Sequence, residues 1–559
     1  MKKQKFVIIV TIVLVAGFLL ASESDIAKAE KKAFDGKGKV LVRGSPIKGA
    51  NGLMFDKNDS LHIASVFGRE IVVMDPKTGK ILNRLGPDVG VEGPDDLTFG
   101  PEGSPYEGYI YWTSILTGEV GRLSSSGVKT GQFVAPGVNP ITFTDAAPYR
   151  LFTALDFLGD GFYEVDPDLS GAPITLHPTL FGLNGFDFGP DGYLYGPLFA
   201  YGLVRIDVNE TPPVTPILVA DGFFPAAAKF DSQGRLHSVD IITGNVFRIN
   251  KDTGDKELIA EIEPGLDNLA FDSRDRVFVS NSVNGAIYHV LPSGQVRTIS
   301  RGGMIGPGGV CVVPRPRGGE SVFVADYWSL KEFNGRTGRA KSQKIHSFGV
   351  LDNFLMPYTV SPYDGNLVLS SAFASMAQVW NPEASVIEAT GAFVYPKNAV
   401  QFQNNIAVAE LGSGSVIHWD PETDGRITLA SGLYVPSGLA AIGNDLWVSD
   451  WASGLVWQIV ADGAPVMLPV ASGLSLPEGL AFDTDGSLLV VESGAGRLSR
   501  IDLLSGIVST VVDGLALGDE AVPGYEAIWS LSDVAVGPSG YIYVTGDVAN
   551  CLYRFKPTR

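Results

Sequence analysis

The chain has 559 residues, more than the roughly 250–300 residues at which a single hydrophobic core stops growing, so we expect two domains of similar size. Apolar residues make up 45% of the chain and charged residues only 18%, which excludes a disordered protein. The 61 acidic residues outnumber the 42 basic residues, and the net charge of −19 argues against a nucleic-acid partner.

Residues 1–29 have the layout of a secretory signal. Three lysines precede about fifteen apolar residues, and small and polar residues follow. Cleavage is expected after Ala21 or after Ala29. An uncleaved membrane anchor through residues 6–20 is the alternative, because this run is slightly shorter than the roughly 20 residues that span a bilayer. In either case we expect a secreted or periplasmic protein with no other contact with a membrane.

One sequence motif recurs along the rest of the chain. It reads NGLMFDKNDSLHIAS from Asn51, NGFDFGPDGYLYGPL from Asn184 and DNLAFDSRDRVFVSN from Asp267, with further copies from Pro477 and Ser532. Each copy predicts a short strand, a turn rich in Asp, Pro and Gly, and a second strand. Two more strands follow each copy. Four antiparallel strands repeated about every 40–45 residues are typical of a β-propeller blade.

Twelve such units are present. Their first strands begin near Asn51, Asp95, Asn139, Asn184, Ala226, Asp267, Gly308, Met356, Asn398, Ser437, Glu478 and Ser532. Because propellers usually close with four to eight blades, we predict an all-β fold of two six-bladed propellers in tandem after a signal peptide. The alternative is five blades plus seven.

We place the first propeller at residues 38–292 and the second at 293–559. The last repeat lacks a fourth strand, and an unassigned strand, KVLVRG at 39–44, precedes the first repeat. We expect KVLVRG to close the sixth blade, which frees the strand QVRTIS at 295–300 to complete the twelfth. Both rings would then have no open sheet edge.

Asn and Asp are concentrated where the inner strands of the first ring begin. Five of the six starting residues carry an amide or carboxylate oxygen, and they are Asn51, Asp95, Asn139, Asn184 and Asp267. Because Ca²⁺ takes six to eight oxygen ligands, the pattern predicts a site for calcium or another divalent cation at the mouth of this channel. The alternative is that each side chain satisfies the turn in which it lies.

The second ring has a weaker candidate site. It combines residues that begin inner strands with carboxylates that end second strands, namely Asn398, Glu410, Asp450, Glu478 and Glu492. The alternative is that each carboxylate accepts hydrogen bonds from backbone amides of an adjacent blade. The long connection at residues 514–530 is expected to lie over this mouth as a lid.

Several kinds of chemistry lack a motif in this sequence. There is no Gly-x-Ser-x-Gly, Cys-x-x-Cys, His-Glu-x-x-His or P-loop pattern, so nucleophilic and zinc chemistry have no support. The two cysteines, Cys311 and Cys551, lie in different repeats. We expect them to be buried apolar residues.

The repeats resemble the calcium-dependent propeller lactonases, a family that includes gluconolactonase, the paraoxonases and the strictosidine-synthase-like proteins. They also resemble NHL-type propellers, in which the same motif occurs without enzymatic activity. The resemblance is most specific in the Asn-Gly pairs at Asn51 and Asn184, in Asp267-Asn268, and in Glu478 of PEGLAF.

The resemblance implies a secreted calcium-dependent hydrolase that acts on a small lactone or ester. Asn139, Asn184 and Asp267 would hold the ion, and Asp267 would also be catalytic by orienting or deprotonating water. The ion would polarise the carbonyl that water attacks. The alternative function is a non-catalytic extracellular scaffold that binds a protein or a glycan. The sequence does not indicate the oligomeric state.

Overall fold

The computed structural model describes residues 34, 38–155, 159–315, 318–346, 354–525 and 530–557. The signal or anchor predicted at residues 1–29 lies outside these ranges. Across the described ranges, no helix has the length and apolarity needed to cross a membrane.

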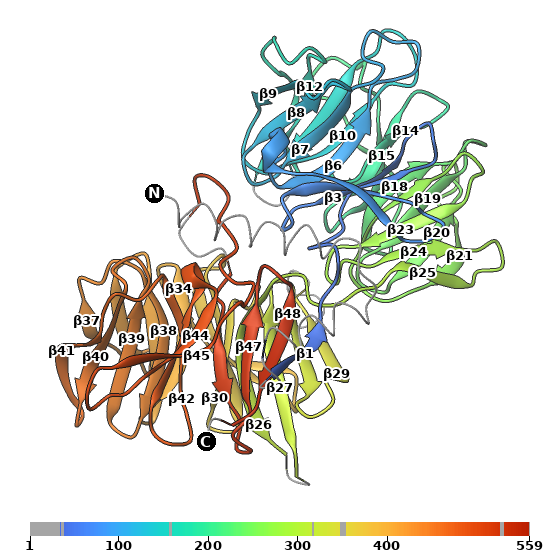
Figure 1. Cartoon of the computed structure of the whole chain (residues 1–559). Helices are drawn as coiled ribbons and strands as arrows, with labels where there is room; N and C mark the ends of the chain where they lie inside the picture. The colour runs from blue at the N-terminus through green and yellow to red at the C-terminus, as the bar shows by residue number, and fades with distance from the viewer. Residues whose placement is uncertain are drawn as a thin grey trace.

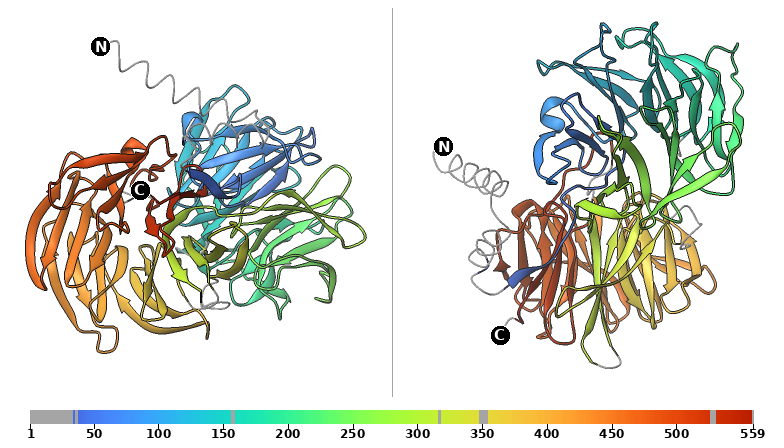
Figure 2. Two further views of the ribbon diagram at one scale, coloured as in Figure 1. Left: turned by 60° about the horizontal axis from the view of Figure 1, so that its bottom comes forward. Right: turned by 90° about the vertical axis from the view of Figure 1, so that its right-hand side faces the viewer.

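The described chain is all β, with twelve four-stranded antiparallel sheets and two short 3-10 helices, η1 (Pro87–Val89) and η2 (Ser493–Ala495). Figures 1 and 2 show that the sheets form two rings placed side by side. The predicted all-β fold of two propellers is therefore confirmed.

The first ring contains six sheets of consecutive strands. In chain order these strands are β2 (Leu53–Phe55), β3 (Leu61–Ser65), β4 (Glu70–Met74), β5 (Ile81–Leu85), β6 (Pro94–Phe99), β7 (Ile110–Ser114), β8 (Glu119–Leu123), β9 (Lys129–Phe133), β10 (Val138–Phe143), β11 (Leu151–Leu155), β12 (Asp160–Val165), β13 (Ile174–Phe181), β14 (Asp187–Phe188), β15 (Leu194–Leu198), β16 (Gly202–Ile206), β17 (Ile217–Ala220), β18 (Pro225–Phe230), β19 (Leu236–Asp240), β20 (Asn245–Ile249), β21 (Lys256–Glu261), β22 (Leu266–Phe271), β23 (Val277–Asn281), β24 (Ile287–Val290) and β25 (Val296–Ser300).

The second ring contains the other six sheets. Its strands are β26 (Pro307–Pro314), β27 (Glu320–Asp326), β28 (Ser329–Asn334), β29 (Ala340–Ile345), β30 (Thr359–Tyr363), β31 (Asn366–Ser371), β32 (Met376–Asn381), β33 (Val386–Ala392), β34 (Pro396–Phe402), β35 (Asn405–Glu410), β36 (Ser415–Trp419), β37 (Arg426–Ser431), β38 (Pro436–Ile442), β39 (Asp445–Asp450), β40 (Leu455–Ala461), β41 (Ala464–Ala471), β42 (Pro477–Phe482), β43 (Leu488–Glu492), β44 (Arg497–Ile501), β45 (Val508–Val512), β46 (Val534–Val536), β47 (Ile542–Gly546), β48 (Cys551–Phe555) and β1 (Gly38–Arg43).

Contacts between inner strands show how each ring closes. In the first ring, each inner strand contacts the inner strand of the next sheet, and β22 of the sixth sheet contacts β2 of the first. In the second ring, the same chain of contacts returns from β46 to β26. The division into six and six blades follows from these two closures.

The outermost strands of two blades differ from the prediction. β1 pairs with β48, from Gly38 opposite Phe555 to Arg43 opposite Cys551, and Figure 1 shows β1 beside β48. β25 pairs with β24 in its own sheet. The expectation that KVLVRG closes the sixth blade and QVRTIS the twelfth is therefore wrong. A short local turn joins β24 to β25, whereas the incomplete twelfth sheet leaves an edge that β1 covers.

The core of each ring lies between adjacent blades. Second strands such as β7, which reads IYWTS, are buried along their whole length, whereas outer strands such as β21 are mostly exposed. This difference arises because a middle strand is covered on both faces by neighbouring sheets. Both cysteines are free and buried in this packing, as expected.

Candidate functional site

A cavity of about 130 Å³ lies at the mouth of the first ring. Its lining includes the starting residue of all six inner-strand segments, which are Asn51, Asp95, Asn139, Asn184, Ala226 and Asp267. The five residues predicted as metal ligands therefore line one space. Their roles as ligands, and the catalytic role of Asp267, stay predictions.

The Asn-Gly pairs of the repeat place amide side chains at this mouth. The Gly52 amide donates to the Asp95 carbonyl of the next blade at 2.8 Å, and a Cβ at Gly52 would lie 2.3 Å from Asp96 Oδ1. A Cβ at Gly185 would lie 2.6 Å from the Ala226 carbonyl, again in the next blade. Glycine is required at both positions because the blades approach each other most closely beside the channel.

Hydrogen bonds orient several of the polar side chains. Asn51 Nδ2 donates to Asp95 Oδ1 at 3.2 Å, which links the first blade to the second. Asn184 Oδ1 accepts from the Gly185 amide at 2.7 Å. This contact agrees with the alternative prediction that the side chain hydrogen-bonds within its own turn. Within the described chain, no three His, Cys, Asp or Glu side chains come together as metal ligands would.

Asp267 has an unusual electrostatic environment. Removal from solvent and the nearby Asp96 carboxylate raise the pKa of Asp267 to about 7, although a hydrogen bond from Ser282 opposes this shift. The carboxyl group therefore exchanges a proton close to neutral pH.

A second layer of charged residues lies on the inner strands, and the sequence analysis did not identify it. Burial raises the pKa values of Asp96 and Asp187, and the Lys229 ammonium opposes both shifts. Lys229 Nζ also donates to the Phe186 carbonyl at 3.1 Å. The signal in the sequence is a charged residue within an otherwise apolar inner strand.

Part of the cavity wall comes from the second ring. Trp328, Ile345 and His346 line the cavity together with Phe199 and Phe224 of the first ring. Trp328 stacks on His346, with ring centroids 6.0 Å apart and an interplanar angle of 9°. His346 Nδ1 donates to the Phe354 carbonyl at 2.8 Å, and burial lowers the pKa of this histidine, so it is neutral at pH 7. Packing between rings has no local sequence signal, so these residues were not predicted.

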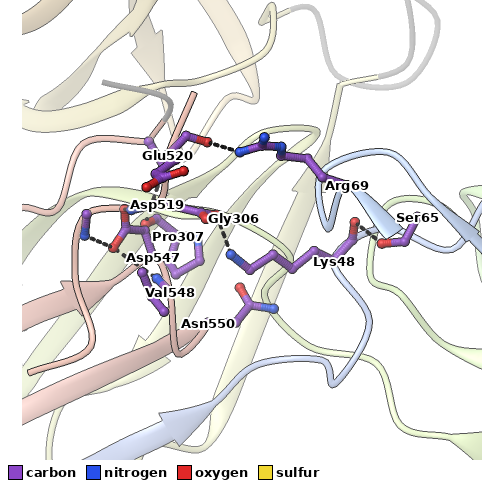
Figure 3. Close-up of polar contacts among 12 residues, drawn as sticks. Lys48, Ser65, Arg69, Gly306, Pro307, Asp519, Glu520, Asp547, Val548 and Asn550 are labelled. Carbon is purple, nitrogen blue, oxygen red and sulfur yellow. Dashed lines mark hydrogen bonds and ion pairs between the residues drawn. The ribbon is translucent and has the colours of Figure 1, made fainter. Parts of the chain in front are cut away.

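The connection at 514–530, predicted as a lid, reaches the first ring in its described part, 514–525. Lys48 forms an ion pair with Asp519, and Arg69 Nη1 donates to the Glu520 carbonyl at 2.9 Å (Figure 3). Tyr525 donates its hydroxyl to the Leu116 carbonyl at 3.1 Å. The connection therefore joins the two rings.

Aromatic packing completes the junction between the rings. Phe67 of the first ring stacks on Tyr327 of the second, with centroids 4.2 Å apart and an interplanar angle of 12°. Val66, Ile305 and Val522 are buried in the same apolar cluster. We call this cluster, with the Lys48 and Arg69 contacts, the inter-ring clasp.

Four of the second-ring candidates accept hydrogen bonds from backbone amides, and three of them do so within their own blade. Asp450 accepts from the Tyr434 and Val435 amides at 3.1 and 2.8 Å, and Glu410 accepts from the Val394 amide at 2.6 Å. Glu492 accepts from the Ser475 amide at 2.9 Å and pairs with Arg497 at 2.7 Å. These amides lie in loops that lead into the blade of each carboxylate, so the observed contacts are structural.

The fourth, Glu478, and the remaining candidate, Asn398, are buried as well. The Glu478 carboxylate accepts from the Ser532 amide at 2.6 Å, and burial together with Asp547 raises the pKa of Glu478 to about 8. Asn398 Oδ1 is buried and has no hydrogen-bond partner among the described residues. Their assignment to a site stays a prediction.

Comparisons with known proteins assign no family. No family model matches the chain, and no curated protein matches it. One solved structure that matches is the extracellular domain of a hybrid two-component system from B. thetaiotaomicron, at 11% identity and a TM-score of 0.31. The match covers 93% of this chain and 82% of that one.

Proposed function

We propose that this chain is an extracytoplasmic binding protein that holds a small ligand at the mouth of its first ring. The observation that supports this function is the cavity of about 130 Å³, which has polar side chains from five blades and walls from both rings. A cavity of roughly 150 Å³ accepts benzene, so this space suits a ligand of about one six-membered ring. The location outside the cytoplasm rests on the predicted signal at residues 1–29.

A binding role agrees with the alternative predicted from the sequence more closely than with the hydrolase. The geometry gives the ligand a defined cavity, whereas the binding of a protein or a glycan across the rings has no described contact to support it. The binding function requires only that the cavity be accessible and that the ligand complement its lining.

The calcium-dependent hydrolase is a second candidate, because all five predicted ligands line one cavity. Their oxygens suit calcium in kind: Asp95 and Asp267 would supply carboxylates, and Asn51, Asn139 and Asn184 would supply amide oxygens. A bound ion would polarise a carbonyl. The raised pKa of Asp267 would let this residue take a proton from water near neutral pH.

Filling the cavity tests the binding function. Ala226 lines the cavity, so Ala226→Trp should occupy the ligand's place, whereas Ala464→Trp on the exposed outer strand β41 is the control. We expect glucose, δ-gluconolactone or a member of a metabolite set to raise Tm of the wild-type and control proteins, on the order of 5 °C at 100 times Kd. The shift should vanish in Ala226→Trp. Equal shifts in all three proteins would place binding elsewhere.

Hydrolysis separates the two candidates. The purified protein is incubated with δ-gluconolactone and p-nitrophenyl acetate, with calcium and with chelator. A binding protein should leave both intact at the background rate. Hydrolysis that depends on calcium and falls at least 100-fold in Asp267→Asn would instead establish the hydrolase, because general-base catalysis contributes about 10²–10⁴-fold.

A further inference from the structure

We propose that the ligand of this cavity is a small organic cation, held between the carboxylates of Asp95 and Asp267 and the aromatic side chains of Phe199, Phe224 and Trp328. The inference rests on the proposed binding function and adds the chemical class of the ligand. It is argued from the charges of the lining, the residues beneath it and the aromatic walls.

The charged groups of the lining favour a cation. Asp95 and Asp267 are acidic, and none of the described residues that line the cavity is Lys or Arg. Burial lowers the pKa of His346, and although its hydrogen bond to the Phe354 carbonyl opposes this shift, the histidine is neutral at pH 7. The net charge of −19 also raises the concentration of cations near the protein. An anionic ligand would meet only repulsion from these groups.

Lys229 is a positive charge that stabilises two carboxylates of this channel. Its charge acts on Asp96 and Asp187 and favours their ionised forms. The charge that acts on Asp267 is instead the Asp96 carboxylate, which is repulsive. The second layer of charged residues therefore contains an ammonium group that offsets its carboxylates. The Asp267 carboxylate at the cavity receives no such favourable charge from Lys229. A bound cation would supply it.

Close packing holds Phe199 in place. A Cβ at Gly182 would lie 2.4 Å from the Phe199 Cβ, so the turn that carries Phe199 rests directly on this glycine. Phe181 packs edge-on against Phe199, with centroids 5.9 Å apart. Phe199 and Phe224 both line the cavity and are each 36% exposed.

Trp328 forms the wall from the second ring. Its ring contacts those of His346 and Phe67, with centroids 6.0 Å from each. A cation near the face of Trp, Tyr or Phe is attracted by the ring quadrupole, most strongly by Trp. This attraction favours the binding of a weakly hydrated organic cation that can contact the ring.

The same lining suits a metal ion less well. Calcium requires six to eight oxygens, and Asp95 Oδ1 and Asn184 Oδ1 already accept hydrogen bonds from within the protein. Aromatic walls supply no oxygen. Two carboxylates and three aromatic side chains that line one cavity complement an alkylammonium group, whose carbon atoms can contact the rings while its charge pairs with the acids.

The test compares cations with a neutral molecule of the same shape. Tetramethylammonium, choline and putrescine are titrated into the purified protein by calorimetry, and 3,3-dimethylbutan-1-ol is the uncharged counterpart of choline. Glucose and CaCl₂ are titrated in parallel. We expect at least one of the three cations to bind, and the neutral counterpart to bind at least 10-fold more weakly than choline if choline is that cation.

Variants assign the binding to these residues. Asp267→Asn should lower the affinity for the cation at least 10-fold. Trp328→Leu should lower this affinity about 3–30-fold, the range for loss of a cation–π contact. Asp145 lies just after the end of β10 that is opposite to the cavity. Asp145→Asn is the matched control and should leave binding unchanged. Circular dichroism confirms that each variant is folded.

The outcomes distinguish this inference from the proposed function. Binding of glucose or another neutral molecule without any cation would overturn the cationic class while the binding function stands. Binding of calcium alone would overturn it in favour of a metal site. Equal affinity for choline and its neutral counterpart, or no binding by any of the three cations, would also overturn it.

Discussion

At the residue scale, carboxylates in or immediately before the inner strands join neighbouring blades. Asp96 Oδ2 accepts from the Ile141 amide at 3.2 Å, and Asp533 Oδ2 accepts from the Val310 amide at 3.0 Å. In each case the amide belongs to the inner strand of the next blade. Burial raises the pKa of Asp533 to about 7, so closing the second ring has an electrostatic cost at higher pH.

This cost predicts how stability depends on pH. The pKa of Asp533 is higher in the folded chain than the ordinary value of 3.8, so its contribution is fully present below about pH 4 and is lost as the pH rises through about 7. Between pH 4 and pH 7 the free energy of unfolding of the wild-type protein should decrease as the pH rises. We expect this decrease to be smaller in Asp533→Asn, by about 1.4 kcal/mol per pH unit. Denaturant unfolding at a series of pH values measures this slope.

The exposed carboxylate Asp221 provides the control for this experiment. Asp221→Asn should leave the slope of the wild-type protein unchanged. The slope, and not the absolute stability, is compared, because an amide at position 533 also changes the hydrogen bonds. A variant at Asp533 with the wild-type slope would contradict the prediction.

The sequence predicted some of the site residues for a clear physical reason. Asn51 and Asn184 stand in Asn-Gly pairs at strand starts, and a repeat with a fixed period places such residues around one axis. Trp328 and Lys229 had no such signal. Trp328 reaches the cavity only through the packing of one ring on the other, and Lys229 follows three alanines in a strand that reads as ordinary core.

At the element scale, β1 supplies the fourth strand of the twelfth sheet. Phe34 adds to this contact by packing edge-on against Tyr553 and Phe555, with centroids 5.8 and 5.5 Å apart. The pairing covers the free edge of β48 and completes the closure of the second ring.

Removing β1 should therefore destabilise one ring selectively. We expect a chain that begins at residue 45 to show a lower Tm for the second ring, with the transition of the first ring unchanged. Differential scanning calorimetry resolves the two transitions when the rings unfold separately. A chain that begins at residue 33 retains Phe34 and β1 and should match the parent protein. A lowered Tm for the first ring alone would contradict the pairing.

Strand number and order were predictable, but the closure of the rings was not. Turn residues and alternating apolar positions mark each blade locally, and all twelve inner strands lie close to their predicted starts. Which outer strand completes which sheet depends on pairing between the two ends of the chain. No local pattern distinguishes β1 as the partner of β48 from β1 as the partner of β24.

At the scale of the whole molecule, the inter-ring clasp positions Trp328 over the first ring. Phe67 is 7% exposed, and its stacking on Tyr327 lies beside the Lys48–Asp519 ion pair. The ligand cavity therefore depends on contacts that lie outside it, because a shift of the second ring would move one of its walls.

Phe67→Ala tests this dependence. Truncation of a buried Phe typically costs 3–5 kcal/mol, so we expect the contact between the rings to weaken by about 3 kcal/mol. Small-angle X-ray scattering should show a larger radius of gyration, and binding at the cavity should weaken. Phe133→Ala, at a side chain that is 64% exposed on an outer strand, is the control and should change neither. Unchanged scattering and binding in Phe67→Ala would show that the clasp does not set the geometry of the rings.

The pairing of β1 with β48 also makes the first ring an insertion within the second. A ribosome delivers β1 before any blade and β48 after nearly all of them, and domains commonly fold as they emerge during synthesis. The inserted ring can close once Ser300 has left the ribosomal tunnel. The surrounding ring must wait for the last strand of the polypeptide, so premature termination of translation would leave one finished propeller beside an unclosed one.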